Sequence, residues 1–169
     1  FFVLFFSTIV SGQITYEHTY YNGFATRIAL ENSGEKYYFV DYTNHKIDFY
    51  NANHTFWKSI VLPIPENNYS IGVTHVSEKK LNSDNLLEVI YNTYSAPNIR
   101  QSKIINEEGT VLLTVDNCYS LSMDEQQGLS TKIISKSANE SKVYSVPEFI
   151  LEHTYALGET KRVILENAG

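Results

Sequence analysis

Two stretches of the chain carry the same four residues, Glu-His-Thr-Tyr, at positions 17–20 and 152–155. A histidine beside a carboxylate is a pair that acid–base catalysis or metal binding can use. Neighbouring side chains of a strand point to opposite faces, however, so Glu17 and His18 should not converge on one substrate. We therefore interpret the motif as a structural joint between repeats and assign it no catalytic role.

Asp84 and Glu88 belong to a polar stretch, residues 82–88, whose side-chain oxygens suit a calcium ion. A calcium loop commonly needs a third carboxylate and a glycine for its sharp turn, and this stretch has neither. We expect a polar hairpin turn before a strand at residues 86–95. Calcium bound by Asp84 and Glu88 is the weaker alternative, and no other cofactor is expected.

Other catalytic signatures are missing from the sequence. The five histidines show neither His-x-x-x-His nor His-Glu-x-x-His spacing, which leaves a zinc enzyme without local support. Cys118, the single cysteine, has no activating cationic or Cys-x-x-Cys context and should be a buried apolar residue. We therefore name no catalytic residue and expect a non-enzymatic protein.

Aromatic side chains are the larger reservoir of binding groups, because the chain holds 13 tyrosines, 9 phenylalanines and 1 tryptophan. Exposed rings stack on sugars or form protein interfaces. Strand alternation buries about half of such rings, so most of them should pack in the core. We name Trp57, Tyr50 and Tyr94 as candidate binding residues for a glycan or a protein.

An internal duplication organises the elements that must position these residues. Residues 17–34 align without a gap with residues 152–169, at an offset of 135. Ten of the eighteen aligned positions are identical, which is too many for coincidence. We expect a repeat unit at residues 13–147 and the start of a second, truncated unit at residues 148–169, as in a fragment of a longer repeat protein.

The repeat unit is filled by β-rich runs that turn residues separate. The runs form three groups. The first group comprises residues 36–42, 46–50 and 55–62, and the second comprises residues 69–77, 86–95, 99–106 and 110–115. The third group comprises residues 118–124, 128–137 and 142–148. Groups of about forty residues with three or four short strands are typical of propeller blades. The predicted fold is all-β: a β-propeller-like tandem array of about three antiparallel blades in a partial ring, with a β-sandwich as the alternative. A partial ring leaves an inter-blade face unpaired, so we expect association or marginal stability.

Composition and the N-terminal residues limit the classes of partner and the location that the sequence allows. A net charge of −6 provides no basic surface for phosphate backbones, which argues against nucleic acid. The first ten residues, FFVLFFSTIV, are apolar and uncharged but shorter than the ~20 residues of a membrane-spanning helix. Small residues follow, so we predict a signal-peptide remnant at residues 1–12, export, and no transmembrane segment. A buried first strand is the alternative.

Two hairpins carry a resemblance to a known family. The stretch KYYFVDYTNHKIDFYNANHTFWKSIVLP, residues 36–63, resembles a blade hairpin of NHL-type propellers, and KIINEEGTVLL, residues 103–113, resembles the matching outer hairpin. The chain is similar to exported repeat proteins of Bacteroidota that often carry a C-terminal type IX secretion sorting tail. The resemblance implies a secreted or cell-surface module that binds a glycan or a protein, or has a structural role. The alternative is part of a secreted hydrolase or its accessory domain.

Overall fold

The computed structural model describes residues 16–21, 23–64, 70–82, 84–95, 99–127, 129–147 and 151–156. The predicted signal-peptide remnant at residues 1–12 lies outside these residues. Twelve strands are present: β1 (Thr26–Leu30), β2 (Gly34–Asp41), β3 (Lys46–Asn51), β4 (Phe56–Val61), β5 (Ser70–Ser77), β6 (Glu88–Ser95), β7 (Ile99–Asn106), β8 (Val111–Asp116), β9 (Ser120–Asp124), β10 (Lys132–Lys136), β11 (Glu140–Ser145) and β12 (Leu151–Ala156). The described ranges hold no helix.

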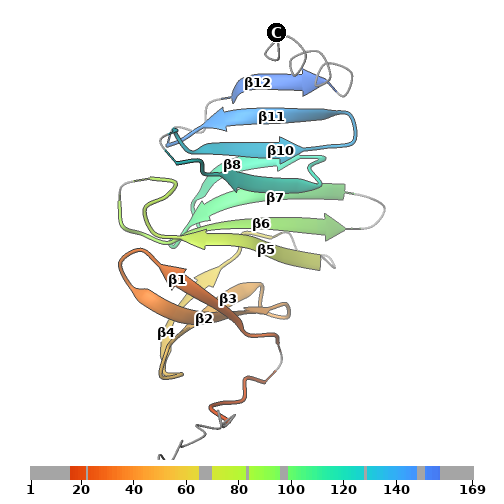
Figure 1. The fold of residues 1–169 in the computed structure, drawn as a ribbon. Coiled ribbons are helices and arrows are strands. Elements are labelled where there is room, and N and C mark those ends of the chain that lie inside the picture. Colours follow the sequence, from red (N-terminus) through yellow and green to blue (C-terminus); the bar gives the residue numbers. More distant parts are fainter. Residues whose placement is uncertain are drawn as a thin grey trace, which may run out of the picture.

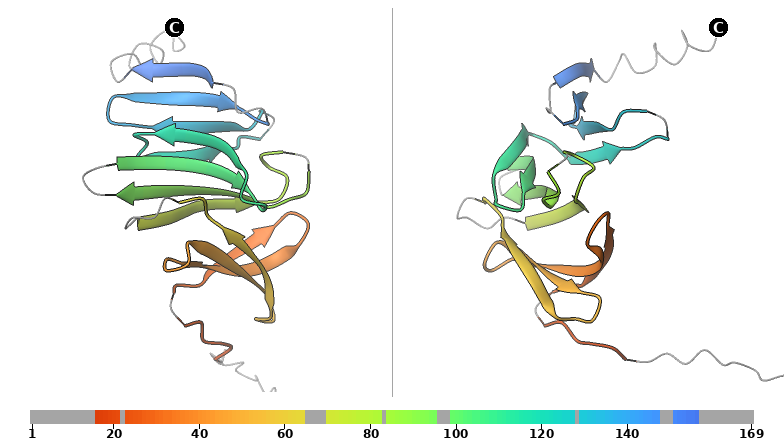
Figure 2. Two further views of the ribbon diagram at one scale, coloured as in Figure 1. Left: turned by 180° about the vertical axis from the view of Figure 1, so that it is seen from behind. Right: turned by 90° about the vertical axis from the view of Figure 1, so that its left-hand side faces the viewer.

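Each group of four successive strands forms one antiparallel meander, so the chain builds three four-stranded sheets (Figure 1). The sheets follow one another in chain order from β1 to β12, as all three views show (Figures 1 and 2). The first strand of the second sheet, β5, contacts both β1 and β9, which are the first strands of the other two sheets. The all-β, blade-like prediction is therefore confirmed as an open array of three sheets.

The second sheet is buried on both faces, because it lies between the other two. Val89 and Tyr91 of β6 belong to the core cluster shared with the first sheet, whereas Ile90 belongs to the cluster shared with the third. All three side chains are fully buried. A strand with two buried faces needs a nearly continuous apolar run, and the sequence LLEVIY supplies it.

The first sheet buries only one face fully. Tyr38 and Val40 of β2 and Phe49 of β3 pack toward the second sheet. The opposite face, which we call the outward face, includes the side chains of Tyr37, Phe39, Asp48, Tyr50, Phe56 and Val61. On this face Phe56 and Val61 remain 59% and 65% exposed. The alternation of buried and half-buried residues along β2 follows from this one-sided packing.

The three sheets repeat the same local irregularities, as expected of blades. In each sheet the register shifts between the third and fourth strands, at Phe49/Tyr50, Ile104/Ile105 and Val143/Tyr144. The turns after β3 and β7 both begin with an asparagine and place their fourth residue in the left-handed region, His54 at φ 66° and Gly109 at φ 81°. Recurring bulges are built-in features of related units.

Carboxylates join the sheets at one end of the array, which we call the clamp end. Glu78 Oε2, after β5, accepts hydrogen bonds from the backbone N–H groups of Asn32 (2.8 Å) and Ser33 (2.9 Å) in the β1–β2 turn. In the reverse direction, Glu31 Oε2 accepts a hydrogen bond from the backbone N–H of Glu78 (2.8 Å). Lys80 Nζ reaches Glu125 Oε2 after β9 at 2.8 Å. The sheets therefore point the same way, and β2 and β6 both end at the side of the array opposite the clamp end.

Candidate functional site

The end of the first sheet opposite the clamp is built around the turn from β2 to β3. Asp41 Oδ1 accepts hydrogen bonds from the backbone N–H groups of Thr43 (3.1 Å) and Asn44 (3.0 Å). Asp41 Oδ2 accepts a third from Asn44 Nδ2 (2.7 Å). A short carboxylate that bonds to backbone amides two and three residues ahead is a standard way to fix such a turn. The turn residues are thus held in one arrangement.

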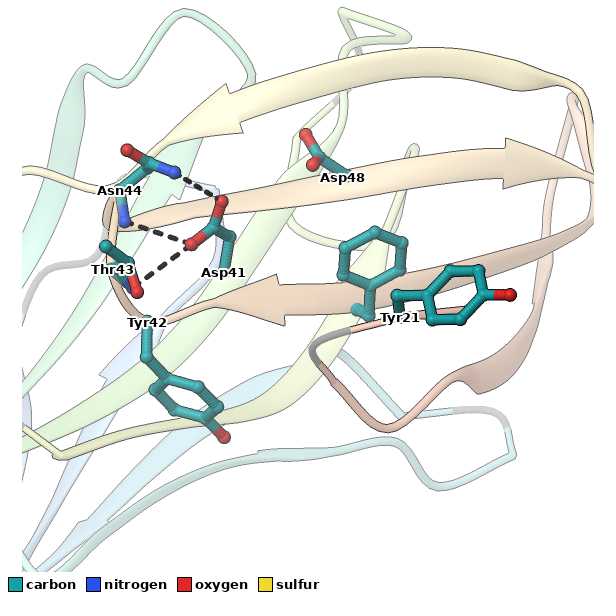
Figure 3. Close-up of a pocket in the computed structure, with 7 residues that line it drawn as sticks. Tyr21, Asp41, Tyr42, Thr43, Asn44 and Asp48 are labelled. Atoms are coloured by element: carbon teal, nitrogen blue, oxygen red, sulfur yellow. Dashed lines mark hydrogen bonds between the residues drawn. The ribbon is translucent and has the colours of Figure 1, made fainter. Parts of the chain in front are cut away.

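A pocket of about 470 Å³ opens at this turn (Figure 3). It is lined by seven residues: Tyr21, Phe39, Asp41, Tyr42, Thr43, Asn44 and Asp48. Tyr21, from the segment before β1, and Tyr42, from the turn, are 78% and 50% exposed. Figure 3 shows the two rings well apart, with Asp41 beside the turn and Asp48 on β3.

The polar side of the pocket is acidic and preorganised. The hydrogen bond from the Asn44 side chain is the main reason that the pKa of Asp41 lies below its ordinary value, so this group stays ionised. Asp48 is held by Lys46 Nζ at 2.7 Å and accepts from the Ser59 hydroxyl at 2.6 Å. The hydrogen bond with Asp48 also raises the pKa of Lys46. One carboxylate is therefore ion-paired, while the other faces the pocket as a hydrogen-bond acceptor.

Exposed tyrosine rings beside fixed acceptors and an amide suit a hydroxylated, largely apolar-faced ligand. Tyrosine supplies an apolar face with a polar tip, and binding sites combine such faces with a few placed polar groups. The acidic side disfavours anionic ligands. Such an arrangement can hold a hydroxylated ligand with a largely apolar face.

A second, smaller pocket of about 130 Å³ lies at the same end of the second sheet. Tyr94, from the end of β6, and Tyr119, after β8, line it together with Arg100. The Arg100 guanidinium carbon lies 4.9 Å from the Tyr94 ring centre and 4.5 Å from that of Tyr119. Two neighbouring sheets thus present tyrosines at the same end of the array.

The three predicted binding residues lie in three different surroundings. Tyr94 lines the smaller pocket. Tyr50 is half-buried on the outward face, edge-on to Tyr20 at 5.1 Å. Trp57 packs against the core, and Lys36 Nζ and Lys58 Nζ lie 4.8 and 4.4 Å from its ring centre. The structure does not bring these residues together.

The residues proposed as a weak calcium site are separated by their burial. Asp84 is exposed, where its Oδ1 accepts from the Leu86 N–H at 2.8 Å and its Oδ2 from Asn82 Nδ2 at 3.0 Å. Glu88 is fully buried in β6 beside Ser77, and burial raises its pKa to about 7. Within the described part of the chain, no group of three or more His, Cys, Asp or Glu side chains is arranged to hold a metal ion.

Sequence reasoning did not select Tyr21 or Tyr42. Tyr21 directly follows the Glu-His-Thr-Tyr motif, and Tyr42 directly follows the turn-closing Asp41. The available signal was that each tyrosine stands beside a turn. Side chains at turns do not follow the alternating burial of a strand, so they are more often exposed.

Comparisons with known proteins do not assign the chain to a family, since no protein-family model and no curated protein matches it. Among the described residues, no helix has the length and apolar character needed to cross a membrane.

Proposed function

We propose that this chain is a non-enzymatic, exported repeat module that binds a neutral glycan through the pocket at the β2–β3 turn. The single observation that carries the proposal is that two exposed tyrosines, Tyr21 and Tyr42, line one pocket together with the fixed carboxylate of Asp41. Sugar rings have apolar faces that stack on aromatic rings and hydroxyls that donate to carboxylates.

The electrostatics of the pocket favour a neutral ligand over an acidic one. Asp41 stays ionised, and the protein as a whole has a net charge of −6. An acidic polysaccharide would meet this charge without a basic partner in the lining. A protein ligand that presents a lysine or an aromatic ring is the outcome to be distinguished by experiment.

The place of action follows from the N-terminal sequence. The apolar run at residues 1–10 and the small residues after it support export, and the resemblance to Bacteroidota repeat proteins supports the cell surface, with the type IX route as the proposed path. The array of blades would then hold the pocket rigidly outside the cell, in a binding or structural role.

A glycan array probed with the full chain tests the proposal. We expect binding to neutral oligosaccharides, weakened about tenfold by Tyr21→Ala or Tyr42→Ala because each removes a stacking surface. Tyr42→Phe keeps the ring and should keep most of the affinity. Tyr16→Ala is the matched control, since Tyr16 is also 78% exposed but does not line the pocket. Binding to no sugar, or equal losses in the Tyr16 and Tyr21 variants, would show that the glycan proposal is wrong.

A further inference from the structure

The two copies of the duplicated motif lie in different surroundings. Residues 152–155 are part of β12, which pairs antiparallel with β11 and places Tyr155 opposite Ser141 and Thr154 opposite Lys142. Residues 17–20 belong to no strand of the three sheets. The same sequence is therefore a fourth strand in one place and, in the other, a segment that packs on the first sheet through its side chains without pairing as a strand.

The isolated copy already has the side-chain arrangement of a strand. The rings of His18 and Tyr20 lie side by side with centres 4.8 Å apart, and those of His153 and Tyr155 in β12 lie 4.2 Å apart. Residues two apart become neighbours on one face only when the backbone is extended. The first copy has this geometry without a partner strand in the array, and His18 and Tyr20 both contact His54 of the first sheet.

The glutamates of the two copies, Glu17 and Glu152, both lie near a basic side chain. In the third sheet, Glu152 of β12 accepts from Lys132 Nζ of β10 at 2.6 Å, across the intervening β11. The equivalent Glu17 is 67% exposed, and its carboxylate lies 3.5 Å from His54 Nε2. A lysine placed like Lys132 would give Glu17 the partner that its copy has.

We infer that residues 16–21 are the fourth strand of a further blade, and that they bind the free edge of a hairpin of the β10–β11 type. Strand addition of this kind gains its affinity from main-chain hydrogen bonds and its specificity from alternate side chains. In this chain the edge of β11 is already taken by β12, so the first copy remains for another hairpin. The inference is argued from the duplication and the pairing alone, although Tyr21 belongs both to this segment and to the proposed glycan pocket.

The surface beneath the segment fits the same partner. Tyr20 lies on the outward face of the first sheet, with its ring centre 5.7 Å from that of Phe39 and 6.2 Å from that of Tyr37. Phe56 and Val61 of this face stay largely exposed. The face that the first sheet turns toward the second sheet is mostly apolar and largely buried. A blade completed by residues 16–21 would cover the outward face in the same manner.

The test adds a hairpin to the full chain. The probe is a synthetic peptide of residues 131–146, closed by a disulfide through Lys136→Cys and Ser141→Cys, because these positions lie opposite each other in β10 and β11. Hydrogen exchange should slow at least tenfold at the backbone amides of residues 17–20 when the peptide is added. Thr19→Pro removes a backbone donor from the segment and should abolish the protection, whereas Thr19→Val should retain it.

Two further measurements keep the result unambiguous. The thermal midpoint of the Thr19→Pro chain should equal that of the wild type, because Thr19 lies outside the three sheets. Glu17→Gln should weaken peptide binding if the Lys132 of the peptide is its partner. Unchanged exchange at residues 17–20 with saturating peptide, or equal protection in the Thr19→Pro chain, would overturn the inference.

Discussion

At the residue scale, Glu88 is the clearest departure from ordinary solution behaviour. Its side chain is fully buried in β6, Ser77 Oγ donates to Oε2 at 3.2 Å, and Oε1 has no hydrogen-bond partner among the described residues. Burial is the main cause that raises its pKa from 4.5 to about 7, and the charges of Asp84 and Glu31 add to it. The folded protein therefore holds this proton at a pH where the unfolded chain has lost it.

The sign of the pH dependence follows directly. Between pH 4.5 and about 7 the folded state binds more protons than the unfolded state at Glu88, so its contribution to stability falls as pH rises. The loss is roughly 3 kcal/mol at most. His75, whose pKa burial lowers, has the opposite slope in part of this window. The difference between wild type and Glu88→Gln therefore isolates Glu88.

Urea unfolding at several pH values measures this difference. We expect Glu88→Gln to gain stability relative to wild type as pH rises from 4.5 to 7.5, and Glu108→Gln, at an exposed turn position, to follow the wild type. A constant gap between wild type and Glu88→Gln across the range would contradict the raised pKa.

The spacing of residues in the sequence could not predict that Glu88 is buried with a raised pKa. The sequence shows an acidic residue four positions after Asp84, which suggested a weak calcium ligand. Its burial depends on the third sheet packing against β6, a long-range contact that no local pattern contains. The pocket tyrosines were missed for a related reason, because Tyr21 and Tyr42 come together only when the first segment lies beside the β2–β3 turn.

At the element scale, most strands could be predicted from β-rich runs and turn residues. The runs at residues 36–42, 46–50 and 55–62 correspond to β2, β3 and β4 within two residues at each end. The strand β1 did not stand out, because Thr26–Leu30 is short and mostly exposed. Turn residues and the alternation of apolar and polar residues are local patterns that the sequence shows directly. A short edge strand forms because it pairs with a neighbouring strand, which local sequence does not show.

Glu31, which recurs in the duplication as Glu166, belongs to the hydrogen-bonded clamp between the first two sheets. Glu31 and the Asn32 amide are two of the groups that exchange hydrogen bonds with Glu78. Burial alone would raise the pKa of Glu78, yet the hydrogen bonds from Ser33 and Asn32 bring it below its ordinary value. The ionised clamp is therefore present at neutral pH and weakens as pH falls.

Glu78→Ala should destabilise the protein by about 1–3 kcal/mol, because two backbone donors of the β1–β2 turn lose their acceptor. Hydrogen exchange should quicken in β1 and β2 before the second and third sheets respond. Glu108→Ala is the matched control, at an exposed turn glutamate. Equal stability of the two variants in urea unfolding would show that the clamp contributes nothing.

At the scale of the whole molecule, the array is open and its outward face is incompletely covered. Val61 is 65% exposed on this face, beside the edge of the first sheet. Exposed apolar faces and strand edges promote self-association. We predict concentration-dependent association of the chain, reduced by Val61→Lys and unaffected by Leu129→Lys, which alters an equally exposed residue in the β9–β10 loop. Sedimentation velocity measures both variants, and equal association would place the contact elsewhere.

The proposed binding face of the whole array is its β2–β3 end. Amide chemical-shift mapping by NMR, with the full chain titrated by the best oligosaccharide from the array, tests this claim most directly. We predict shifts confined to Tyr21 and the residues around the turn from Phe39 to Asp48, with a smaller response near Tyr94. Shifts centred on the clamp end, around Glu31 and Glu78, would contradict the account.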